Sequence, residues 1–136
     1  MAIKVKWEGG HTFIGETESG AQVIIEPGPK YGGSGKYPTP MELVAMAHGG
    51  CTGLDIVMIL EKMRVKVTRL EVGVETKRRE EPPEYFEEIN LTYTVSGEGV
   101  SEENVRRAVD LSHEKYCSVG AMLEDKAKIS YEVRIV

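Results

Sequence analysis

The chain has 136 residues, a length typical of one domain with a single hydrophobic core. Apolar residues make up 40% of it and charged residues 29%, which is an ordinary globular composition. The net charge of −5 argues against a general nucleic-acid binder, because contact with phosphates needs a basic face.

The chain shows neither an apolar N-terminal signal segment nor an unbroken apolar run of membrane-spanning length. Glu42, His48 and Asp55 interrupt the longest apolar stretch. We therefore expect one domain over residues 1–136, located in the cytoplasm and without a membrane partner. Amide side chains are scarce, since Gln22, Asn90 and Asn104 are the only ones, and this bias predicts a thermostable protein.

The first part of the chain predicts a small sheet. Gly9-Gly10 and Ser19-Gly20 are natural hairpin turns between short apolar segments. The apolar run Val23–Ile25 predicts that the third strand is buried on both faces. The Gly- and Pro-rich residues 27–38 predict a flexible loop. The expected strands are residues 3–8, 12–17 and 21–26.

A long helix is predicted from Thr39 to about Arg64. Thr39 is the expected N-cap, Pro40 suits the first helical position, and Glu42 completes a capping box. The helix is apolar almost all round, so we expect it to be buried from several sides. Glycines in its middle section allow another backbone to approach closely.

The second half of the chain predicts two longer strands, a helix and a final strand. Ser101 is the expected N-cap of the helix, and its inner stripe ends near Tyr116-Cys117, which places Tyr116 in the core. Because strands and helices are segregated along the chain, the predicted class is α+β. The expected elements are strands 70–78, 85–96 and 128–135 and a helix over 101–117.

The only two cysteines each follow a histidine by one helical turn. The pairs are His48-Gly-Gly-Cys51 and His113-Glu-Lys-Tyr-Cys117. Spacings of three and four residues place each His and Cys on the same face of a helix. In a reducing cytoplasm, such cysteines favour a catalytic or metal-binding pair over a structural disulfide. The pattern thus leaves thiol redox chemistry and metal binding open.

Two segments carry a resemblance to a known family. Residues 32–43, leading to Gly49-Gly50-Cys51-Thr52, and residues 114–119, around Cys117, resemble the two cysteine motifs of the OsmC/Ohr family of thiol-dependent peroxidases. The residues around them look most like the YhfA-like branch. The resemblance implies an OsmC-like fold, in which antiparallel sheets wrap around long central helices in an intertwined homodimer with its active sites at the subunit interface.

The same resemblance implies the chemistry. Cys51 would be the thiolate that attacks an organic hydroperoxide, and Cys117 would be the resolving thiol that closes a disulfide with it. An external dithiol reductant would restore both thiols, and no cofactor would be needed. The apolar surroundings of Cys51 favour an organic hydroperoxide over hydrogen peroxide as the substrate.

The chain departs from the family pattern in the residues that activate the thiolate. The studied peroxidases use an arginine before the central helix, held by a glutamate directly after the proline, whereas this chain has no arginine before Arg64. Met41 follows Pro40, and Glu42 comes one residue later. We expect Glu42 to replace that carboxylate, and His48 or a loop lysine (Lys30 or Lys36) to activate Cys51.

Other interpretations remain open from the residues alone. Cys51, Cys117, His48 and His113 could form a Cys₂His₂ metal site of the type that zinc prefers. The same fold could instead be a non-catalytic dimer that binds a lipid or another small molecule in an apolar interface pocket. Glu42 also has a purely structural role available as a capping residue, and the two histidines could be core side chains.

Overall fold

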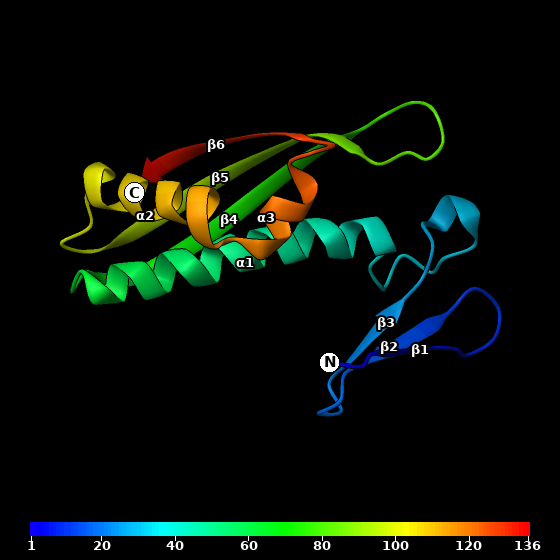
Figure 1. Ribbon diagram of the computed structural model, residues 1–136. Coiled ribbons are helices and arrows are strands. Elements are labelled where there is room, and N and C mark those ends of the chain that lie inside the picture. Colours follow the sequence, from blue (N-terminus) through cyan, green and yellow to red (C-terminus); the bar gives the residue numbers. More distant parts are fainter. The chain divides into compact units, whose positions relative to one another are not determined.

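The computed structural model describes residues 1–136, which form two compact units, an N-terminal unit (Met1–Val44) and a C-terminal unit (Ala45–Val136) (Figure 1). The mixture of strands and helices confirms the predicted α+β class. In chain order the elements are β1 (Lys4–Trp7), β2 (Phe13–Glu16), β3 (Gln22–Ile25), η1 (Pro29–Tyr31), α1 (Pro40–Lys62), β4 (Lys66–Arg78), β5 (Phe86–Glu98), α2 (Glu102–Leu111), η2 (Ser112–Tyr116), α3 (Ser118–Leu123) and β6 (Lys128–Ile135).

The N-terminal unit contains an antiparallel sheet in the order β1-β2-β3. Both predicted hairpin turns are confirmed. Gly9, Gly10 and Gly20 have φ values of 102°, 54° and 91°, a conformation that glycine adopts without steric cost. The prediction that β3 is buried on both faces is wrong, because Val23 is 43% exposed: the unit holds a single sheet, with no second layer of its own over this residue.

The loop over residues 27–38 is tethered and contains the short 3₁₀ turn η1, whereas the sequence predicts no regular element there. The carboxylate of Glu26 accepts hydrogen bonds from Thr12 Oγ1 at 2.7 Å and from Ser34 Oγ and N at 2.6 and 3.0 Å. The bonds from Ser34, followed by the bond from Thr12, lower the pKa of Glu26. The Gly-rich turn is therefore fixed to the end of β3.

The C-terminal unit contains a sheet in the order β4-β5-β6. The β4–β5 pair is antiparallel, as the predicted fold requires, but the β5–β6 pair is parallel. The sheet is mixed because α2, η2 and α3 carry the chain back to the end of the sheet at which β5 begins. Strand β4 begins at Lys66 rather than Leu70, since a register irregularity between Val67 and Arg69 breaks the alternation at its start.

The helices of this unit cover one face of its sheet (Figure 1). Tyr93 on β5 hydrogen-bonds to Thr52 on α1 and to His113 on η2, and Tyr131 on β6 hydrogen-bonds to Asp110 on α2. These hydrogen bonds all lie on the face of the sheet that carries the Tyr93 side chain. The largest fully buried hydrophobic side chains of the core are Ile56, Leu60, Ile89, Leu91, Tyr93, Val95, Val105 and Val109.

The turn η2 is a π-helix that changes the register at the end of α2. The Cys117 amide donates to the carbonyl of Ser112 at 2.8 Å, a bond that spans five residues rather than four. The extra residue turns Tyr116 outward and Cys117 inward, with exposures of 51% and 4%. The prediction of Tyr116 as a core residue is therefore wrong.

Helix α1 begins with the predicted capping box. Thr39 N donates to Glu42 Oε1 at 2.9 Å, and Glu42 N donates to Thr39 Oγ1 at 3.2 Å. By length and composition alone, α1 could cross a membrane, a test that core helices of soluble proteins also pass. The absence of a membrane partner stays a prediction.

The expected burial of α1 from several sides is not met within the single chain. His48, Thr52, Ile56 and Leu60 form its buried face. Met46, Leu54 and Met58 are more than half exposed, at 57%, 68% and 56%. These three apolar side chains repeat at intervals of four and eight residues, so they share one side of the helix. We call them the exposed ridge of α1.

Gly49 allows α1 to pack closely against β4. A β-carbon at Gly49 would lie 2.9 Å from Val74 Cγ2, whereas one at Gly53 would lie 3.4 Å from Val72 Cγ2. We expect Gly49→Ala to lower the free energy of unfolding by about 1–2 kcal/mol, because the stiff valine must move. Gly53→Ala is the matched control and should be neutral or stabilising by up to about 1 kcal/mol. Urea unfolding of both variants tests this, and equal effects would contradict it.

Candidate functional site

The structure brings the two cysteines together. Cys51 lies in the middle of α1, and Cys117 lies between η2 and α3. The Cys51 and Cys117 side chains are within hydrogen-bonding reach of each other, and both are free thiols. Cys51 is half-buried and Cys117 is buried, so a molecule from solvent can reach Cys51 but not Cys117.

The surroundings of Cys117 favour its protonated form. Burial raises the pKa of the Cys117 thiol to about 11, and the nearby Cys51 and Asp55 act in the same direction. The amide of Gly120 donates to Cys117 Sγ at 3.2 Å and opposes this effect in part. At neutral pH, Cys117 therefore keeps its proton and can donate it in a hydrogen bond to Cys51.

A chain of hydrogen bonds runs beside the thiols from α1 to η2. Thr52 Oγ1 donates to the backbone carbonyls of His48 and Gly49, each at 3.3 Å, and the Tyr93 hydroxyl donates to Thr52 Oγ1 at 2.9 Å. Tyr93 has then used its one proton, so His113 Nε2 must donate to the Tyr93 oxygen at 2.8 Å. The pattern assigns His113 the tautomer protonated at Nε2.

His113 is fixed on several sides. Its ring stacks on Tyr131, with centroids 4.1 Å apart and planes 11° apart, and Tyr131 donates to Asp110 Oδ1 at 2.7 Å. Burial, followed by the neighbouring His48, lowers the pKa of His113 to about 4. His113 is therefore neutral at pH 7, and its contacts serve the packing of η2.

His48 is fully buried, and neither of its ring nitrogens has a hydrogen-bond partner. Its ring meets that of His113 edge-on at 6.2 Å, and burial lowers its pKa. A β-carbon at Gly120 would lie 3.1 Å from His48 Nε2 and 3.3 Å from Cys117 Sγ. The predicted site residue His48 thus lies close to the Cys117 thiol.

The other predicted site residues belong to the N-terminal unit. Glu42 caps α1 with Thr39, and its role in the chemistry stays a prediction. Lys30 lies 5.8 Å from the centre of the Tyr31 ring, and Lys36 lies near enough to Glu26 to lower the pKa of that carboxyl. Each of these charges has a local partner within its own unit.

Asp55, one helical turn after Cys51 on α1, accepts a hydrogen bond from η2. Ser112 Oγ donates to Asp55 Oδ2 at 2.8 Å. Sequence reasoning missed Thr52 and Tyr93 as parts of the site. The alternation of β5 places Tyr93 among buried positions, and a buried tyrosine hydroxyl requires a partner; that signal could have identified it.

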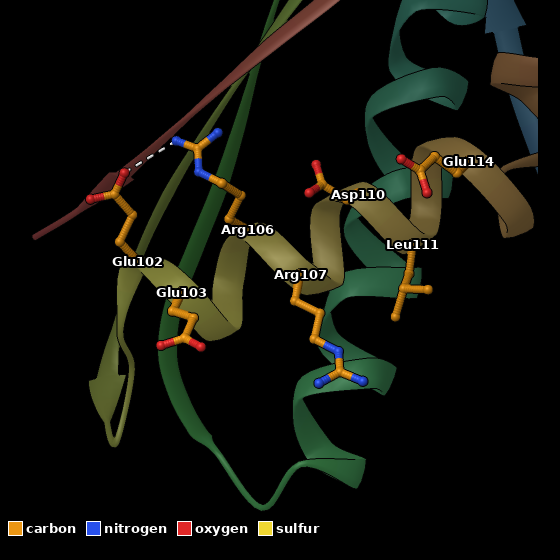
Figure 2. Close-up of a pocket in the computed structure, with 7 residues that line it drawn as sticks. All are labelled: Glu102, Glu103, Arg106, Arg107, Asp110, Leu111 and Glu114. Carbon is orange, nitrogen blue, oxygen red and sulfur yellow. Dashed lines mark hydrogen bonds and ion pairs between the residues drawn. The ribbon is translucent and has the colours of Figure 1, made fainter.

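Two other features do not contribute to the site. No group of three or more His, Cys, Asp and Glu side chains lies close enough to hold a metal ion, so the geometry does not support the Cys₂His₂ alternative. A hollow along α2 and the start of η2 combines four carboxylates with two arginines, among which Glu102 and Arg106 form an ion pair at 3.2 Å (Figure 2). An exposed pair of this kind has a small effect on stability.

The fold and the thiol pair define a class of small α+β proteins with two cysteines in contact. A family model described as OsmC-like protein matches residues 33–132, and the chain belongs to this family. Protein YhfA from Escherichia coli (strain K12) is 47% identical over 137 residues, which cover 100% of this chain and 98% of YhfA. The predicted OsmC/Ohr family and its fold are confirmed.

Solved structures agree with this assignment. A hypothetical protein from Aquifex aeolicus VF5 is 34% identical, with a TM-score of 0.83, and the match covers 99% of this chain and 96% of that one. An organic hydroperoxide resistance protein from Elizabethkingia anophelis shares the fold at 16% identity and a TM-score of 0.76, with 100% and 97% of the two chains covered.

The half-buried His113 predicts a loss of stability in mild acid. Its pKa is about 4 in the folded protein and 6.5 unperturbed, so its contribution to stability is present above pH 6.5 and is lost as the pH drops towards 4. We expect about 1 kcal/mol less free energy of unfolding at pH 5 than at pH 7, because solvent screening reduces the effect at a half-buried group. His113→Gln keeps a donor near Tyr93 and should show a smaller pH effect, whereas His11→Gln should behave as the unmodified protein. Urea unfolding at both pH values measures this, and equal pH effects in both variants would refute it.

Proposed function

We propose that this protein is a thiol-dependent peroxidase that reduces organic hydroperoxides through Cys51 and a Cys51–Cys117 disulfide. The observation that carries the proposal is the contact between an accessible and a buried free thiol. A two-cysteine peroxidase needs this asymmetry, because the first thiol must meet the substrate and the second must be close enough to close the disulfide.

The proposed reaction has two oxidative steps. The Cys51 thiolate attacks the distal oxygen of the hydroperoxide, the O–O bond breaks, and the alkoxide leaves as an alcohol after taking a proton. Cys51 is then a sulfenic acid. Cys117 attacks its sulfur, the S–S bond forms, and the oxygen leaves as water. An external dithiol restores both thiols by exchange.

The local contacts support Cys51 as the attacking thiol. Cys51 is the more accessible of the two thiols, whereas Cys117 is buried and stays protonated beside it. No cofactor takes part in this scheme. Glu42 is proposed as the carboxylate of the site, in place of the family glutamate. A reducing compartment such as the cytoplasm supplies the dithiol that the cycle requires.

We also propose that the protein is a homodimer. The exposed ridge of α1, formed by Met46, Leu54 and Met58, is an apolar surface along a central helix, and burying it in a second copy removes it from water.

The E. anophelis protein named as an organic hydroperoxide resistance protein shares the fold, which fits a peroxidase role for this chain as well.

The alternative of a small-molecule binder has one supporting feature. An apolar pocket within the N-terminal unit has a volume of about 370 Å³ and is lined by aromatic and proline side chains beside one carboxylate. Its walls include Phe13, Ile25, Pro27, Tyr31 and Glu26. A cavity of this size and polarity suits a small apolar ligand.

The peroxidase proposal predicts the fate of both thiols. One equivalent of cumene hydroperoxide should remove both free thiols of each chain, because the oxidised Cys51 is captured by Cys117. Cys51→Ser should keep its remaining thiol, since Cys117 is buried and protonated. Cys117→Ser should lose one thiol and accumulate a sulfenic acid. Thiol titration and mass spectrometry follow these changes.

Intact thiols under excess peroxide, in protein whose Cys51 still reacts with an aromatic disulfide, would overturn the peroxidase proposal. A co-purified organic molecule in native mass spectra, together with that result, would favour the binder instead. Displacement of such a molecule by a bulky substitution at Ile25 would place it in the N-terminal pocket.

The dimer proposal predicts a sensitivity of α1 to charge. Leu54→Glu should convert the dimer to monomer, because the carboxylate must otherwise be buried in an apolar contact. Met122→Glu is the matched control, since Met122 on α3 is an apolar side chain of similar exposure, at 72%. Sedimentation velocity distinguishes the species. A monomeric unmodified protein, or an equal effect of both substitutions, would reject this interface.

A further inference from the structure

We infer that His48 is the base that takes the proton of the Cys117 thiol when the disulfide forms. The inference rests on the proposed thiol chemistry and assigns a role within it that differs from activation of Cys51. Burial is the main cause of the raised pKa of the Cys117 thiol, which therefore keeps its proton at pH 7. Attack on the oxidised Cys51 would be slow without a nearby proton acceptor.

His48 is the base of this cluster whose ring nitrogens make no hydrogen bond. It is 0% exposed, and neither Nδ1 nor Nε2 has a partner, an arrangement that folded proteins rarely tolerate without a reason. His113, the other imidazole, is already bound through Nε2 to Tyr93 and stacked on Tyr131. Of the two histidines, His48 alone keeps both ring nitrogens available.

The surroundings of Gly120 place His48 close to the Cys117 thiol. The point at which a Gly120 β-carbon would lie is 3.1 Å from His48 Nε2 and 3.3 Å from Cys117 Sγ. Because Gly120 has no side chain, both atoms can lie close to this point. Proton transfer between them requires direct contact or one bridging water molecule.

The protonation states fit an acceptor. Burial lowers the pKa of His48, so its ring is neutral and has a lone pair at physiological pH. The titratable groups placed near it are His113 on η2, at 6.2 Å between ring centroids, and Cys117 before α3; Tyr93 on β5 contacts His113 in turn. Burial keeps Tyr93 and His113 in their neutral forms.

The step balances in atoms and charge. His48 Nε2 accepts the Cys117 proton as the sulfur attacks the Cys51 sulfenic acid, which an organic hydroperoxide has generated. The S–S bond forms and the S–O bond breaks. The leaving hydroxide takes the proton back from the imidazolium and departs as water, so His48 returns to its neutral form.

A peroxide-free assay isolates this step. Cys51 reacts with the aromatic disulfide DTNB and releases one thionitrobenzoate; attack by Cys117 on the resulting mixed disulfide releases a second. We expect His48→Gln to slow the second release by at least about tenfold at pH 7, and the first release by less than about threefold. Equal slowing of both releases, or an unchanged second release, would overturn the inference.

The pH dependence of the second release distinguishes a proton-accepting His48 from a residue with a structural role. In the unmodified protein the second release should be nearly constant from pH 7 to 9, because His48 is neutral throughout. In His48→Gln it should rise about tenfold per pH unit, because the reaction then depends on free hydroxide and the Cys117 thiolate. A flat profile in His48→Gln would contradict the inference.

A second variant leaves His48 itself in place, in case His48→Gln does not fold. Gly120→Ala adds a methyl group 3.1 Å from His48 Nε2 and 3.3 Å from Cys117 Sγ, closer than either atom accepts without moving, so the second release should slow as well. Gly73→Ala is the control, since its β-carbon would only meet Thr92 at 3.9 Å. An unaffected Gly120→Ala protein would refute the role. The DTNB assay uses no peroxide. If it gives the expected result while the protein fails to reduce peroxides, only the proposed function is rejected.

Discussion

The hydroxyl group of Tyr93 connects the three elements that carry the candidate site. It donates to Thr52 on α1 and accepts from His113 on η2, while its own ring is anchored in β5. Burial raises the pKa of this hydroxyl, so it remains a neutral link that needs both partners. Because Cys51 precedes Thr52 and Cys117 follows η2, this one group fixes the helix and the turn from which the two thiols meet.

Local signals made much of the fold predictable. The capping box of Thr39 and Glu42 involves residues three apart, and the glycines at the hairpin turns act through their own φ values. Such features depend on neighbours in the sequence, so the chain displays them directly. The prediction that Cys51 and Cys117 lie together had a different basis. It followed from the resemblance of the two motifs to a family, since spacing alone left both redox and metal chemistry open.

Other features depended on contacts that no short segment contains. The π-helical turn that exposes Tyr116 and buries Cys117 adds one residue to a regular helix, and its sequence shows no distinct pattern. The parallel pairing of β5 and β6 depends on the path of the chain between them. The unpartnered nitrogens of His48 become evident only when every neighbour is in place.

The unequal accessibility of the two sulfurs also gives direction to the return half of the proposed cycle. Once they are joined, an incoming dithiol can approach only the Cys51 sulfur, so the transient mixed disulfide must form there and Cys117 must be the leaving group. A thiol with a high pKa leaves slowly, and a proton donor beside it speeds the departure. An imidazole that removes a proton from Cys117 during oxidation would have to return one to it during reduction.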